Sequence, residues 1–128
     1  MTQQVQTDEA PSFEALGLPI SQARVHDGTV YVSGQVGIDP ETGELVDGGV
    51  RDQTKQTLAN IEAILKAAGA SVEDIVKATV FVEDMDDIGA VNEEYEVFMT
   101  EPYPARSAVE VSELALKCEV EIEVTAGL

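Results

Sequence analysis

The sequence predicts a single α+β domain in which two helices pack on one face of a mixed β-sheet. Apolar residues alternate with other residues in several short stretches, which is typical of strands. Between these stretches lie two segments whose apolar residues recur every three or four positions, as in amphipathic helices. The chain has 128 residues, 44% of them hydrophobic, which is enough for one core but leaves no room for a second domain.

The first part of the chain is polar and then turns into a strand. Residues 1–22 are expected to be mostly loop, with a short strand around Val5 as one alternative and with residues 1–10 poorly ordered. A strand is predicted in "TVYVSGQVGID", where Val30 and Val32 share one face. The next segment, "DPETGEL", is predicted to be a turn, because proline and glycine suit turn positions.

Two helices are predicted. The first spans Asp52–Ala68 and is followed by Gly69, at a position where glycine often ends a helix. The second begins at a cap on Asp84 or Asp86 and ends before Pro102. The apolar stripes that predict them are Leu58, Ile61, Leu65 and Ala68 in the first helix and Ile88, Val91, Tyr95 and Phe98 in the second.

Three more strands follow from alternation, which gives the order two strands, helix, strand, helix, two strands. One lies between the helices, in "DIVKATVFVED", and the closing two are Ser107–Val111 and Glu119–Thr125. In the strand between the helices, one face is expected to carry Val76, Ala78, Val80 and Val82, and the other Ile75, Lys77, Thr79 and Phe81.

The last strand, "VEIEVT" after Glu119, has a face of glutamates. Glu119, Glu121 and Glu123 are predicted to lie opposite the apolar face. A solvated face is the usual interpretation of such a pattern. If another subunit covers this face, however, burial would raise the pKa of a glutamate there, which suits a general acid or base.

The charge balance argues against nucleic-acid binding. Twenty-five acidic and seven basic residues give a formal net charge of −18, and the basic residues are scattered along the chain. Binding to DNA or RNA needs clustered lysine and arginine, so it is not expected. Carboxylates spread over the surface fit a protein from a high-salt source, where screening weakens repulsion between like charges.

Nothing in the sequence predicts a membrane or a redox role. No stretch approaches the roughly 20 apolar residues of a transmembrane helix, and the polar start does not resemble a signal peptide, so we expect a cytoplasmic protein. Cys118 is the single cysteine and is expected to be an apolar filler. His26 precedes an Asp-Gly turn pair and is the only histidine, so no metal site is predicted.

Arg106, in "PARSAVE", leaves two interpretations open. It could form a structural salt bridge with one of the many carboxylates. It could also bind an anion in a functional site, because a guanidinium holds a carboxylate through two parallel hydrogen bonds. Ser33, in "VSGQ", has no histidine base near it in the sequence, so a serine–histidine triad is not expected.

Several segments together resemble the RidA, or YjgF-type, family of reactive-intermediate deaminases. They are "YVSGQVGIDPETGELV", "QTLANIEAILKAAGAS", "DIVKATVFVEDMDDIGAVNEEYEVF", "PARSAVEV" and "VEIEV", and the similarity runs from about residue 17 to the C-terminus. The resemblance implies a chorismate-mutase-like fold that assembles as a homotrimer with ligand clefts between subunits. It also implies cofactor-independent hydrolysis of 2-aminoacrylate, 2-iminopropanoate and 2-iminobutanoate to 2-keto acids and ammonia.

The resemblance also implies roles for individual residues. Arg106 would bind the substrate carboxylate, and Glu121 would activate the attacking water and relay a proton to the leaving nitrogen. Gly34 would let the chain approach the ligand, and the backbone at Ala108 would contact it. The full set of substrate-binding residues implied by the resemblance is Ser33, Gly34, Asn92, Ser107, Ala108 and Ile20.

Three positions depart from the family pattern. Ile20, in "GLPISQA", stands where many members have a tyrosine that reaches the cleft. Ala108 replaces a frequent cysteine, and Ala115 replaces a common proline. The missing hydroxyl leaves open a non-catalytic trimer that binds small 2-keto or carboxylic acids, and a protein-interaction or chaperone-like role. Ribonuclease activity, also attributed to the family, fits poorly with the negative charge.

Overall fold

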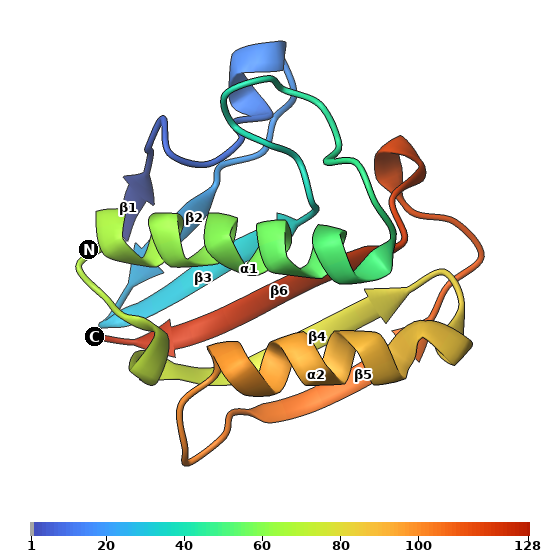
Figure 1. Ribbon diagram of the computed structural model, residues 1–128. Coiled ribbons are helices and arrows are strands. Elements are labelled where there is room, and N and C mark those ends of the chain that lie inside the picture. The colour runs from blue at the N-terminus through green and yellow to red at the C-terminus, as the bar shows by residue number, and fades with distance from the viewer. Residues whose placement is uncertain (1) are drawn as a thin grey trace.

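The computed structural model describes residues 2–128, which form a six-stranded mixed sheet with both long helices on one face (Figure 1). The strands are β1 (Thr2–Val5), β2 (Ala23–His26), β3 (Thr29–Gln35), β4 (Ile75–Val82), β5 (Ala105–Glu110) and β6 (Val120–Gly127), and the helices are α1 (Val50–Ala67) and α2 (Ile88–Phe98). The strand order is β1-β2-β3-β6-β4-β5. Only the β4–β5 pair is parallel among these strands. The predicted α+β class with two helices on one face is confirmed.

Strand β2 was not predicted. It pairs antiparallel with β3 through a two-residue turn, in which Asp27 has φ 49° and Gly28 has φ 78°. Two consecutive positive φ values are typical of the turn that joins hairpin strands with the correct twist. β2 has four residues, of which only Ala23 and Val25 are buried, so its alternating pattern is short.

The core lies between the sheet and the helices. The predicted stripe of α1 is confirmed for Leu58, Ile61 and Leu65, which are at most 2% exposed. On β4 the prediction for Val76 was wrong, because this side chain is 57% exposed and Ile75 is buried instead. The cause is a register shift between Ile75 and Lys77 in the pairing with β6, which breaks the alternation at the start of the strand.

A buried polar layer under α1 holds the loop after β3. The Asn60 side chain donates hydrogen bonds to the carbonyl oxygens of Val36 and Ile38, at 3.1 and 2.9 Å. Gln53 donates to the Glu119 carboxylate at 3.0 Å and accepts from the Glu119 backbone N–H at 2.8 Å. Glu119 therefore precedes β6 and is held by α1, so its predicted place on the glutamate face was wrong.

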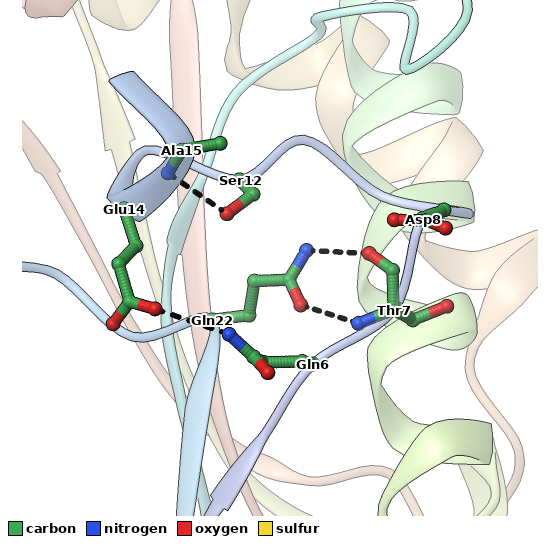
Figure 2. Close-up of a pocket in the computed structure, with 7 residues that line it drawn as sticks. All are labelled: Gln6, Thr7, Asp8, Ser12, Glu14, Ala15 and Gln22. Atoms are coloured by element: carbon green, nitrogen blue, oxygen red, sulfur yellow. Dashed lines mark hydrogen bonds between the residues drawn. The ribbon is translucent and has the colours of Figure 1, made fainter. Parts of the chain in front are cut away.

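The N-terminal segment is attached to the sheet through Gln22. Its side chain accepts a hydrogen bond from the Thr7 N–H at 2.8 Å and donates to the carbonyls of Thr7, Ala10 and Pro11 at 3.0, 3.1 and 2.9 Å. Figure 2 shows Gln22 at the centre of this polar pocket. The sequence predicts poor order for residues 1–10. In the structure, however, residues 2–10 include strand β1 and the buried side chains of Val5 and Ala10. Met1 lies outside the described residues.

Ion pairs are few. Within residues 2–128, Arg51 of α1 pairs with two glutamates of α2, Glu93 at 3.2 Å and Glu94 at 2.8 Å. His26 lies 3.2 Å from Asp27, a contact that is an ion pair only when the imidazole is protonated. No helix among the described residues is long and apolar enough to cross a membrane. Most carboxylates of this chain therefore have no cationic partner within the described part of the molecule.

Candidate active site

Glu121 lies on the face of the sheet that neither helix covers. Its neighbours in β6, Val120 and Ile122, are fully buried under the helices, so alternation directs Glu121 to the open face. Its side chain is half-buried there. The glutamate face predicted from the sequence is thus confirmed for Glu121 and for the exposed Glu123.

A β-bulge in β3 brings the main chain close to Glu121. Val32 pairs with Val124 and Gln35 pairs with Ile122, so two residues, Ser33 and Gly34, lie opposite one residue of β6. At Gly34 a Cβ atom would collide with the Glu121 carboxylate. Glycine is therefore needed here to leave room for the carboxylate.

Ser33, the other residue of the bulge, is hydrogen-bonded to the segment that precedes β2. Its hydroxyl donates a hydrogen bond to the Ser21 carbonyl at 2.6 Å, and its N–H donates to the Gln22 carbonyl at 3.0 Å. These bonds hold Ser21 and Gln22 against β3, and the adjoining Ile20 lines the same pocket as Glu121. The Ser33 hydroxyl proton is thus engaged with the main chain.

These residues line a pocket of about 530 Å³. Its wall is mainly apolar, and its polar side chains are those of Ser33, Glu121 and Glu123. The lining residues are Phe13, Leu16, Leu18, Ile20, Ser33, Gly34, Val36, Ala115, Leu116, Glu121 and Glu123. Burial raises the pKa of Glu121, and the nearby charge of Glu123 raises it further. A carboxyl group with a raised pKa exchanges protons more readily near neutral pH, as a general base or acid must.

Arg106 is arranged quite differently, at the edge strand β5. It lies beside Ala78 of β4, which is fully buried under the helices, so Arg106 also projects toward the helices. Its guanidinium carbon lies 4.8 Å from the centre of the Tyr95 ring on α2. No described carboxylate forms an ion pair with Arg106. The salt-bridge interpretation therefore has no support within residues 2–128.

Within one chain, the two predicted catalytic side chains lie on opposite faces of the sheet. Glu121 pairs with Phe81 of β4, whereas Arg106 pairs with Ala78 of the same strand. Residues three apart on a strand project from opposite faces, and paired residues project from the same face. One chain therefore cannot bring Glu121 and Arg106 to a common ligand.

The remaining predicted site residues, apart from Ser107, divide in the same way. Ile20, Ser33 and Gly34 line the Glu121 pocket. Ala108 packs partly buried against the core on the Arg106 side of β5, while Ser107 is exposed on the open face. Asn92 is exposed on α2, the helix that carries Tyr95.

Other candidates do not form a site. Cys118 is fully buried, and its burial and the charge of Glu121 raise the pKa of its thiol to about 11, which agrees with the predicted filler role. His26 is exposed, as predicted, and contacts Thr2 and Asp27. In residues 2–128 no three histidine, cysteine, aspartate or glutamate side chains come together as metal ligands.

Sequence reasoning missed the pocket wall and the partner of Arg106. Phe13, Leu16 and Leu18 lie in the segment expected to be loop, and their apolar character was the only available signal. Tyr95 was predicted as part of a core stripe, which it is, but its contact with Arg106 depends on how α2 packs on β5.

Comparison with known proteins places the chain in a family. The model of the family described as "Endoribonuclease L-PSP" matches residues 12–128. The 2-iminobutanoate/2-iminopropanoate deaminase of Mus musculus is 48% identical over 122 residues, which are 95% of this chain and 88% of the mouse protein.

Solved structures agree. The crystal structure of RidA from Psychrobacter sp. has a TM-score of 0.92 and 44% identity, covering 98% of this chain and 99% of that one. Escherichia coli TdcF, solved with bound serine, has a TM-score of 0.89 and 37% identity, covering 98% of each chain. The chain therefore belongs to the endoribonuclease L-PSP family, the family of the RidA and YjgF proteins.

Proposed function

We propose that this protein is a hydrolytic deaminase that converts 2-iminobutanoate, 2-iminopropanoate and their enamine forms to 2-keto acids and ammonia. The observation that carries the proposal is the half-buried Glu121 in the wall of a mainly apolar pocket, with its pKa raised by burial. Relatives that bear the name 2-iminobutanoate/2-iminopropanoate deaminase and are 44% to 48% identical to this chain support it.

The residues suit a simple reaction. Ionised Glu121 accepts a proton from a water molecule as the water oxygen bonds to the imine carbon. Glu121 returns that proton to the nitrogen, which gives a neutral carbinolamine. Glu121 then accepts the hydroxyl proton as the carbonyl forms and donates it to the nitrogen as the C–N bond breaks, so that the nitrogen leaves as ammonia. Imine and water thus give 2-keto acid and ammonia. An imine carbon is already electrophilic, so positioning and one proton relay are sufficient.

Arg106 would bind the substrate carboxylate through two hydrogen bonds. Because Arg106 and Glu121 project from opposite faces of one sheet, we propose that each site forms between two copies of the chain. A homotrimer, in which every copy supplies Glu121 to one site and Arg106 to the next, satisfies this requirement. In this arrangement Ile20, Ser33 and Gly34 come from the first copy, and Asn92, Ser107 and Ala108 from the second.

One observation favours a second function, the binding of a small 2-keto acid without turnover. Ile20 lies in the pocket beside Glu121 and offers no hydroxyl. A carboxylate could still bind to Arg106 without a complete proton relay. Endoribonuclease activity, which the family description names, is disfavoured because a net charge of −18 repels RNA.

The test is keto-acid and ammonia release from 2-aminoacrylate, which a dehydratase generates from serine in molar KCl. Wild type is compared with Arg106→Ala, and binding of 2-oxobutanoate is measured separately by calorimetry. Faster hydrolysis by wild type alone supports the deaminase. Binding of 2-oxobutanoate without any acceleration would replace it with the binding function.

A further inference from the structure

The contact between Tyr95 and Arg106 has a role that packing alone does not require. We propose that Tyr95 is a positioning residue, whose ring holds the Arg106 guanidinium with its donors free for a substrate carboxylate. This inference rests on the proposed function of Arg106. Tyr95 itself is not expected to touch the substrate, because it is only 7% exposed.

Arg106 has no carboxylate partner within the described residues. Of the three arginines, only Arg51 forms ion pairs there, with Glu93 and Glu94. Arg24 and Arg106 form none, although Arg106 is partly exposed in a chain with twenty-five acidic residues. No described carboxylate therefore occupies the donors of Arg106.

The geometry of the Tyr95–Arg106 contact suits this role. A guanidinium carries all its N–H donors in its plane, while its flat face can lie on an aromatic ring. The distance of 4.8 Å between the Arg106 carbon and the ring centre is within the range of a cation–π contact. A stacked contact of this kind would use the face of the group and leave the donor edges free. A carboxylate partner would instead occupy the donors that a substrate needs.

The Tyr95 ring is buried between α2 and the core. Tyr95 lies on the core side of α2, one turn after the fully buried Val91. Its hydroxyl is buried and has no hydrogen-bond partner among the described residues. Phenylalanine would therefore fill the same space without burying an unpaired hydroxyl. This provides a matched variant, because Tyr95→Phe keeps the ring face and removes only the hydroxyl.

The experiment compares Tyr95→Leu and Tyr95→Phe, with Phe98→Leu as a control for losing a partly buried aromatic ring from the same helix. For Tyr95→Leu we expect KM for 2-iminobutanoate and Kd for 2-oxobutanoate to rise by roughly 3- to 30-fold. Its kcat should stay within about twofold of wild type, because the chemistry at Glu121 is unchanged. Tyr95→Phe and Phe98→Leu should match wild type in both constants.

A double-mutant cycle separates positioning from folding. In an Arg106→Ala background, Tyr95→Leu should cause no further loss of 2-oxobutanoate affinity, since the group that it positions is gone. The proposal is overturned if Tyr95→Leu still weakens binding there, or if Tyr95→Phe is as damaging as Tyr95→Leu.

A third readout does not depend on the proposed function. If wild type shows neither turnover nor 2-oxobutanoate binding, the deaminase proposal fails. The NMR resonance of the Arg106 Nε–H then tests only whether the Tyr95 ring contacts the guanidinium. It should move in Tyr95→Leu and stay in place in Tyr95→Phe, and an unchanged resonance in Tyr95→Leu would overturn the inference.

Discussion

The Glu121 and Arg106 side chains project from opposite faces of one sheet and lie in different environments. Glu121 is set among apolar side chains on the open face, where loss of water raises its pKa. Arg106 is placed over an aromatic ring on the helix face. A chain can thus contain both groups of the proposed site without containing the site itself, since its own sheet separates them.

The largest effect should come from Glu121→Gln, which removes the proton relay and keeps the shape of the side chain. We expect turnover of 2-iminobutanoate to fall by roughly 10²- to 10⁴-fold. Binding of 2-oxobutanoate should be nearly unchanged, because Arg106 remains. Stopped-flow measurement of imine loss and calorimetry check the two parts, and equal loss of binding and turnover would contradict the assignment.

The same variant should be more stable than wild type at neutral pH. The pKa of Glu121 is raised in the folded protein, so its ionisation costs stability as pH rises through the unfolded and then the folded pKa. Glutamine removes this cost. The gain in Tm should disappear below about pH 4, where the carboxyl group is protonated in both states. A gain that persisted there would have another cause.

Mixing two inactive variants tests the separation directly. Arg106→Ala and Glu121→Gln, unfolded together and refolded at equal amounts, should regain activity. About one quarter of the sites would then combine an intact Arg106 from one copy with an intact Glu121 from another. Activity no higher than that of the separate variants would show that both groups act within one chain.

Gly34→Ala should damage the Glu121 side alone. The added methyl group displaces the Glu121 carboxylate, which is the flexible end of a side chain, so turnover should fall about tenfold or more with little change in Tm. Gly37→Ala is the matched control. Its Cβ would lie 2.9 Å from the Gln53 backbone, so it should lower Tm. Equal Tm losses in both variants would contradict this distinction.

The smallest effect concerns pH. Glu123 is the second cause of the raised pKa of Glu121, after burial. If ionised Glu121 is the active form, Glu123→Gln should move the acidic limb of the kcat–pH profile to lower pH. The limb should stay above the pKa of a free glutamate, because burial of Glu121 is unchanged. Glu73→Gln, at an exposed position before β4, removes one charge outside the lining of the pocket and should leave the limb in place.

The fold could be predicted from local patterns wherever an element was long and regular. Alternation in β6 and the helical period in α1 gave correct faces. The predictions failed where contacts between distant segments overrode the local pattern. At Val76 a register shift between β4 and β6 exposes the side chain, and at Glu119 a hydrogen bond from Gln53 of α1 holds the carboxylate.

The site was less accessible to sequence reasoning. Resemblance to a family supplied Glu121 and Arg106, but not their separation by the sheet, which depends on the register of β5 and β6 against β4. The close approach of Gly34 to Glu121 likewise depends on a bulge that no short stretch of sequence specifies.

The scarcity of ion pairs has a consequence for assembly. Within residues 2–128 only Arg51 and His26 take part in ion pairs, so most carboxylates remain uncompensated. In the proposed trimer, the uncompensated charges of the copies would approach one another, and cations would gather around them. Cations are then reactants in the association, taken up as each copy joins. In the proposed arrangement a complete site needs two copies. The number of complete sites per chain would therefore rise with the concentration of cations in the surrounding solution.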